Sequence, residues 1–180
     1  MSRSTYYAPL GAFLDHWDGV RMVTLELLDR FEEADLEYRL VPAWRTIAEL
    51  FHHIGGHQYF VSRGILLQRW SPRENEPDAD WAAHRTAVCA SKAGLAAWLN
   101  VTQAAMNDWG ANASPELLEG LRRDNPWHEG IRGWLLLHHA YQDELHHRGQ
   151  LYAIAQLLGR TPPVVFAEEN PDYWDERKGK

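Results

Sequence analysis

The chain has almost no cysteine, because Cys89 is the only one among its 180 residues. A single cysteine excludes an internal disulfide and a cysteine-rich metal site, and its scarcity is typical of a reducing compartment. The sequence also lacks any apolar run near the ~18 residues that a membrane span requires. Its first ten residues lack the apolar stretch of a secretory signal. We therefore predict a cytoplasmic protein that does not bind membranes.

Clustered positive charge is missing as well. The formal net charge is −7, with 18 lysines and arginines against 25 aspartates and glutamates. The short basic pair Arg122-Arg123 is followed at once by Asp124. Because binding to a nucleic-acid backbone depends on grouped lysine and arginine side chains, we expect no nucleic-acid partner.

Apolar residues recur at spacings of three and four, which indicates helices, and strand-like alternation is missing. The pattern predicts four long helices, at about 9–31, 47–69, 81–109 and 131–158. A short helical turn is expected at Ser114-Pro115, and Gly159 with Pro162 marks the end of the last helix. We predict an all-α protein whose single domain spans residues 1–163, followed by a loosely packed tail at 164–180.

Two polar side chains interrupt the apolar stripe of the last helix. Asp143 and His147 lie one turn apart on the face that also carries Leu136, Ala140 and Leu151. A buried carboxylate or imidazole is costly unless it is paired, hydrogen-bonded or bound to metal. The last helix therefore offers two candidate ligands.

The second helix offers two more. Thr46 and Glu49 form a capping-box pattern that places its start. From there, His53 and His57 lie along the edge of the apolar stripe, whereas His52 points well away from it. In a bundle, His53, His57, Asp143 and His147 can meet at one point, where three protein ligands would leave a position open for water or substrate.

Two other interpretations of these residues stay open. A hydrogen-bonded pair of Asp143 and His53 would satisfy the same polar groups without metal. His138, His139 and His146 lie off the inward stripe, although His139 could contact a ligand from outside. Four of the nine tryptophans lie in or beside loops, where they would cover helix ends or a pocket: Trp44, Trp70, Trp81 and Trp127.

A second apolar line runs along the last helix, opposite the ligand stripe. It consists of Trp134, Leu137, Tyr141, Leu145 and Tyr152. A helix that is apolar on two sides is buried on two sides. Either the bundle covers this line or a second copy of the chain does, and we predict a homodimer.

Two sequence elements resemble a known family. His147-Arg148-Gly149-Gln150 lies in a long final helix that closes with Leu-Leu-Gly-Arg-Thr-Pro-Pro, and the second helix opens with Thr-Ile-Ala-Glu-Leu-Phe-His-His-Ile at 46–54. Together they resemble the DinB/YfiT-like superfamily of metal-binding four-helix bundles, over nearly the whole chain to about residue 163. The resemblance implies an up-down-down-up bundle, often dimeric.

The resemblance also implies a divalent metal, zinc or nickel, held by His53, Asp143 and His147. The commonest pattern of the family has histidine where this chain has Asp143, so the identity of the metal is in question. Similar proteins include transferases or isomerases that use bacillithiol, mycothiol or glutathione. We therefore expect an enzyme that activates a thiol, or a water molecule for hydrolysis, and acts on a small-molecule substrate. His57 is the candidate general base, and the alternative is a non-catalytic metal-binding stress-response bundle.

Overall fold

The computed structural model describes residues 8–70, 79–126 and 130–164 of the chain. Four long helices make up the bundle, α1 (Ala8–Arg30), α2 (Ile47–Leu66), α4 (Lys92–Gly110) and α6 (Gly133–Leu157). Shorter elements connect them, namely η2 (Glu33–Asp35), α3 (Ala79–Cys89), α5 (Pro115–Glu119), β1 (Leu121–Arg122) and β2 (Ile131–Arg132).

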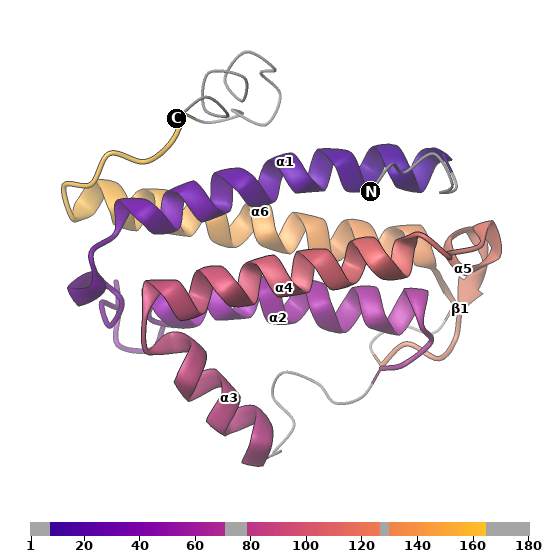
Figure 1. Cartoon of the computed structure of the whole chain (residues 1–180), viewed down its shortest axis with the longest axis horizontal. Helices are drawn as coiled ribbons and strands as arrows, with labels where there is room; N and C mark the ends of the chain where they lie inside the picture. The colour runs from indigo at the N-terminus through magenta and orange to yellow at the C-terminus, as the bar shows by residue number, and fades with distance from the viewer. Residues whose placement is uncertain (1–7, 71–78, 127–129, 165–180) are drawn as a thin grey trace.

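The long helices run up, down, down and up. Figure 1 shows α1 and α6 running in one direction and α2 and α4 in the other. Helix α2 packs against both α4 and α6, and α1 packs against the same two helices. The predicted all-α bundle and its topology are confirmed. No helix in the described ranges combines the length and the apolar character needed to cross a bilayer.

Two of the predicted helix ends are formed as the sequence indicated. The hydroxyl of Thr46 accepts a hydrogen bond of 3.0 Å from the amide of Glu49, whose carboxylate accepts one of 2.9 Å from the amide of Thr46. This capping box begins α2. Past the end of α6, Gly159 has a φ of +72° and the amide of Arg160 donates to the carbonyl of Ala155 at 2.8 Å.

The predicted single helix over 81–109 is wrong, because the chain breaks between α3 and α4 (Figure 1). Ser91 is extended, with φ −159°, and its hydroxyl accepts a hydrogen bond of 3.0 Å from the amide of Gly94. A Cβ atom on Gly94 would lie 2.7 Å from the carbonyl oxygen of Val88, so the bend needs glycine there. The break turns α3 away from the bundle axis.

A short hairpin precedes α6, which the sequence pattern did not predict. Leu121 and Arg122 of β1 pair with Arg132 and Ile131 of β2 in an antiparallel register. The ladder is two residues long, and hence too short for a period-2 pattern to be recognised. The predicted turn at Ser114-Pro115 is confirmed as α5, with proline in its first turn.

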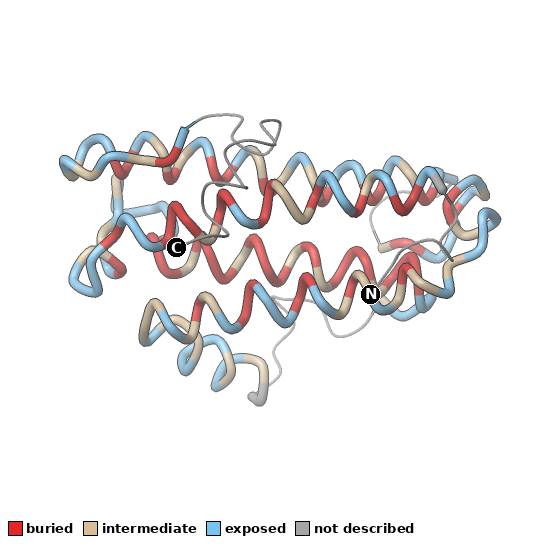
Figure 2. Tube along the Cα trace, turned by 45° about the horizontal axis from the view of Figure 1, so that its top comes forward, coloured by how far each residue is buried: buried red, intermediate tan, exposed pale blue. Residues whose placement is uncertain are grey.

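Figure 2 shows buried residues along the full length of the long helices. They form two apolar clusters, toward opposite ends of the bundle. One contains Leu28, Phe51 and Ile154, and the other contains Leu14, Val61 and Leu136. Buried polar side chains lie between these clusters in sequence on all four long helices, including Arg21, Gln58, Thr102 and Glu144. The bundle therefore has a polar layer across its middle.

Arg21 and Glu144 form the centre of this polar layer. They are 2% and 1% exposed, and the guanidinium lies 2.9 Å from the carboxylate. Trp17 and Thr24 also donate to Glu144, each at 2.7 Å. Arg21 donates further to the side chain of Gln58 at 2.8 Å and to a carbonyl of α4. Burial acts to raise the pKa of Glu144, but the charge of Arg21 and these hydrogen bonds hold it below its usual range.

The second apolar line of α6 is largely covered within the chain. Leu137 is fully buried, and Trp134, Tyr141 and Leu145 are partly buried against the same apolar cluster. Tyr152 packs in the same way against the other cluster. The line does not require a second copy of the chain to cover it, and the homodimer stays a prediction.

Candidate metal centre

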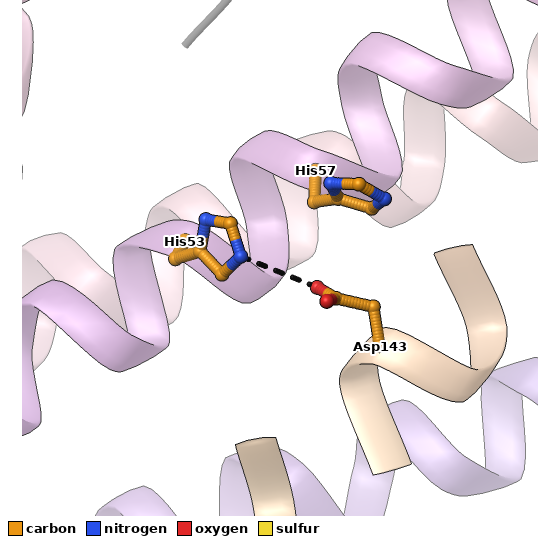
Figure 3. A group of neighbouring side chains, drawn as sticks. All are labelled: His53, His57 and Asp143. Carbon is orange, nitrogen blue, oxygen red and sulfur yellow. Dashed lines mark ion pairs between the residues drawn. The ribbon is translucent and has the colours of Figure 1, made fainter. Parts of the chain in front are cut away.

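The four candidate ligands converge beside the polar layer. His53 and His57 lie one turn apart on α2, and Asp143 and His147 lie one turn apart on α6. Figure 3 shows both imidazoles of α2 on the same side of the helix, with the carboxylate of Asp143 directed between them. His57 and Asp143 each precede a member of the polar layer, Gln58 and Glu144. The bonds from Arg21 to these two neighbours therefore fix α2 against α6 at the level of the site.

Asp143 is the centre of the cluster. One carboxylate oxygen lies 3.4 Å from Nε2 of His53, and the other lies 3.5 Å from Nε2 of His147. Donor atoms of His53, His57 and Asp143 all lie within 4.8 Å of one another. Two donor atoms bound to one tetrahedral zinc ion lie about 3.4 Å apart, since each bond is roughly 2.1 Å. Small side-chain rotations would therefore bring these atoms to bonding distance of one ion.

The surroundings keep Asp143 ionised. Burial acts to raise the pKa of this carboxyl, but the interactions with the imidazoles of His147 and His53 and the charge of His57 outweigh it. Its pKa is therefore held well below its usual range. An anionic carboxylate facing imidazole nitrogens has the protonation state that metal binding requires.

His147 is oriented by a neighbour on the same helix. Its Nδ1 forms a hydrogen bond of 2.8 Å with the side-chain oxygen of Gln150, which leaves Nε2 facing Asp143. Metal-binding imidazoles are commonly held in this way, because the second nitrogen's partner fixes the ring and its tautomer. Gln150 belongs to the quoted His-Arg-Gly-Gln element, but its role was not predicted, although a spacing of three residues on a helix indicates such a contact.

A cavity of about 1070 Å³ lies against the imidazoles. It follows α2 past His53 and His57, with α3 and the first half of α6 contributing the side walls. Phe60, Leu135 and Leu136 supply apolar surface. Its volume is at the upper end of the range for small-molecule sites, so it can hold a ligand well beyond fragment size.

A smaller hollow of about 330 Å³ is also lined by the segment before α2. His147 and Gln150 line it, whereas His53 and His57 line the larger cavity. Trp44 lines both, and its side chain is 46% exposed. Of the two uses expected for loop tryptophans, Trp44 has the pocket-lining one, while Trp127 lies outside the described residues.

The donor atoms that lie close enough together for one ion are those of His53, His57 and Asp143. His147 lies 3.5 Å from Asp143, and its role as the third ligand stays a prediction. His139 is exposed and its ring centroid lies 5.3 Å from that of His57, so it contacts the site from outside. The donor set of imidazoles and one carboxylate suits divalent ions such as zinc and nickel. The arrangement fits a metal. The alternative was a hydrogen-bonded pair of Asp143 and His53, but the carboxylate oxygen 3.4 Å from His53 Nε2 is buried and has no hydrogen-bond partner among the described residues.

His52 is 1% exposed, a burial that the sequence pattern did not predict. Its ring stacks on Trp98 of α4 at 5.6 Å, and Trp81 and His84 of α3 cover it. The bend at Ser91 that folds α3 back against α2 explains this burial, and an unbroken helix would not have placed α3 there.

The comparisons with known proteins agree with this fold. The model of the DinB family matches residues 1–177. A crystal structure of a DinB-like protein from Bacillus subtilis, YjoA, superposes with a TM-score of 0.65 at 20% sequence identity. The superposition covers 84% of this chain and 94% of that one, and at this identity it shows the fold alone. No curated protein matches the chain.

Proposed function

The chain belongs to the DinB family, and we propose that it is a metal-dependent enzyme in which His53, Asp143 and His147 hold one divalent ion, zinc or nickel. The observation that carries this proposal is the convergence of an ionised carboxylate and three imidazoles beside a cavity of about 1070 Å³. An open cavity favours catalysis over storage, because a substrate can approach the ion.

A divalent ion at this place would lower the pKa of a thiol or a water molecule that approaches it. His57 lines the cavity and its ring centroid lies 5.7 Å from that of His53. We assign His57 as the base that accepts the proton from the S–H or O–H group. The sulfur or oxygen then forms a bond to an electrophilic carbon of the substrate while the leaving group departs with its electron pair. Bacillithiol, mycothiol or glutathione would serve as the thiol.

Variants of His57 and His147 distinguish the general base from a metal-binding residue. The assignment predicts that His57→Gln keeps the metal and lowers turnover by about 10²- to 10⁴-fold, the usual contribution of a general base. His147→Ala should lose the metal and with it the turnover. The measurement is metal content together with the rate of conjugation between a low-molecular-weight thiol and an activated chloroarene.

The opposite pattern would contradict this assignment. If His57→Gln loses the metal and His147→Ala keeps it, the ligands are His53, His57 and Asp143, whose donor atoms also lie within 4.8 Å of one another. His16→Gln is a matched control, because its exposed imidazole bonds to Tyr141 and does not line the cavity. A metal-loaded protein that turns over no thiol and no hydrolysable substrate would favour the non-catalytic metal-binding bundle instead.

We also propose a cytoplasmic homodimer. Trp134 and Tyr141 retain partial exposure on α6, and Leu135 beside them is 56% exposed. Sedimentation equilibrium at micromolar concentration should then give about twice the chain mass of 20.8 kDa. A mass of one chain would mean that the bundle alone covers this side of α6.

A further inference from the structure

The cavity beside the candidate metal centre has an excess of positive charge, although the chain as a whole is acidic. Among the described residues, its lining contains three arginines, Arg39, Arg45 and Arg85, and one carboxylate, that of Glu49. The net charge of the whole chain is −7. A cavity whose charge is opposite to that of its protein selects ligands by sign, because low-dielectric walls concentrate the field inside it.

One of these arginines is already occupied within the protein. Arg39 donates to the carbonyl of Trp44 at 2.7 Å and lies 3.3 Å from the carboxylate of Glu49. The same carboxylate accepts from the amide of Thr46. Arg39 and Glu49 thus neutralise each other and hold the segment before α2 in place. The charge that remains for a ligand comes from the other two arginines.

Arg45 and Arg85 have no ion pair or hydrogen-bonding side-chain partner among the described residues. Most other arginines of the described ranges have one, for example Arg30 with Glu26, Arg122 with Asp124 and Arg160 with Asp35. Arg45 immediately precedes Thr46 at the start of α2, and Arg85 lies on α3. Both side chains are exposed, and from two elements they line one cavity without a counter-charge among the described residues.

We propose that Arg45 and Arg85 form an anion-binding subsite that holds a carboxylate of the ligand while its reacting end lies at the imidazoles. The planar guanidinium has paired N–H donors that match the two oxygens of a carboxylate. The identity of the reacting end rests on the proposed function, whereas the subsite does not. Among the three candidate thiols, glutathione and bacillithiol carry carboxylates and mycothiol carries none, so the subsite selects the first two.

The test uses S-methylglutathione, which keeps both carboxylates but has no thiol for a metal. Isothermal titration of the metal-loaded protein should show binding, and Arg45→Gln and Arg85→Gln should each weaken it by about tenfold, the lower end for a hydrogen bond to a charged group. Arg123→Gln is the matched control, because this exposed arginine is not part of the cavity lining. It should bind the probe as the unmodified protein does.

The diethyl ester of the same probe lacks the negative charge of both carboxylates and therefore measures how much that charge contributes to binding. We expect the ester to bind the unmodified protein about tenfold more weakly than the diacid, and to bind the two variants without further loss. Three results would each overturn the subsite: equal binding of diacid and ester by the unmodified protein, binding of the diacid by both variants as tight as by the unmodified protein, or no binding of the diacid at millimolar concentration. Thiol entry is followed separately, as a change in the absorption spectrum of the cobalt-loaded protein on adding glutathione. If glutathione changes the spectrum of the unmodified protein and of both arginine variants alike, the proposed function stands and the subsite is rejected. If the binding of S-methylglutathione depends on Arg45 and Arg85 but glutathione changes no spectrum, the subsite stands and the proposed function is rejected.

Discussion

Replacing Asp143 with alanine is expected to lower the affinity for a divalent ion by more than about 100-fold. The carboxylate lies between His53 and His147, at 3.4 and 3.5 Å from their nitrogens, so its removal takes away the donor that links α2 to α6. It also removes the negative charge that offsets one unit of the charge of the ion. Residues that only orient a ligand typically contribute 10- to 100-fold, and a ligand must exceed that.

Two further variants sharpen this prediction. Asp143→His restores the donor set that is commonest in the family, so it should keep the metal and acidify a bound thiol or water more strongly. Asp108→Ala is the matched control, because it removes an exposed aspartate of α4. Competition with a chromophoric chelator measures all three affinities. A loss of only 10- to 100-fold in Asp143→Ala would make the carboxylate an orienting group, and an unchanged affinity would contradict its placement at the ion.

Replacing Arg21 with methionine is expected to lower the free energy of unfolding by about 3–5 kcal/mol. The substitution leaves the carboxylate of Glu144 in the bundle interior without its cation, and an uncompensated buried charge has a cost of this size. Arg21 and Glu144 are 2% and 1% exposed, so solvent cannot replace the lost partner. Urea unfolding in the presence of a chelator measures this cost without the contribution of a bound metal.

An exposed pair supplies the control for this experiment. Arg132 lies 3.8 Å from Glu119, and their side chains are 61% and 48% exposed. Arg132→Met should cost less than about 1 kcal/mol, as exposed pairs do. Substituting both Arg21 and Glu144 with apolar residues should recover part of the loss. A loss below 1 kcal/mol in Arg21→Met would mean that water reaches the carboxylate.

The sequence predicted the bundle because most of its signals are local. The capping box at Thr46, the glycine stop at position 159 and the apolar spacing of α1 and α6 each depend on a few neighbouring residues. The proximity of His53 and Asp143 was also predictable, because two amphipathic helices that pack in one core bring together the polar side chains on their apolar faces. These features can therefore be predicted from the amino-acid sequence alone.

Other features depend on contacts between distant segments. Glu144 follows Asp143, and a charged residue at this place predicts a solvent-exposed side chain. Instead, Glu144 is paired with Arg21, 123 residues away in sequence. The burial of His52 depends on α3, whose separation from α4 was hidden because the apolar spacing continues across the break. Ser91 with Gly94 was the available signal, a capping serine followed by glycine. The sequence did not indicate that Arg85 lines a cavity, because this depends on the packing of α3 against α2.

If this chain holds a divalent ion between α2 and α6, metal analysis of the purified protein will detect it. The protein would be purified without added metal or chelator and measured by elemental analysis, beside the His53→Ala variant as reference. We expect about one zinc or nickel ion per chain in the unmodified protein and an empty site in the variant. Protein that contains no divalent metal and takes up none on titration, or a variant that retains full occupancy, would contradict this expectation.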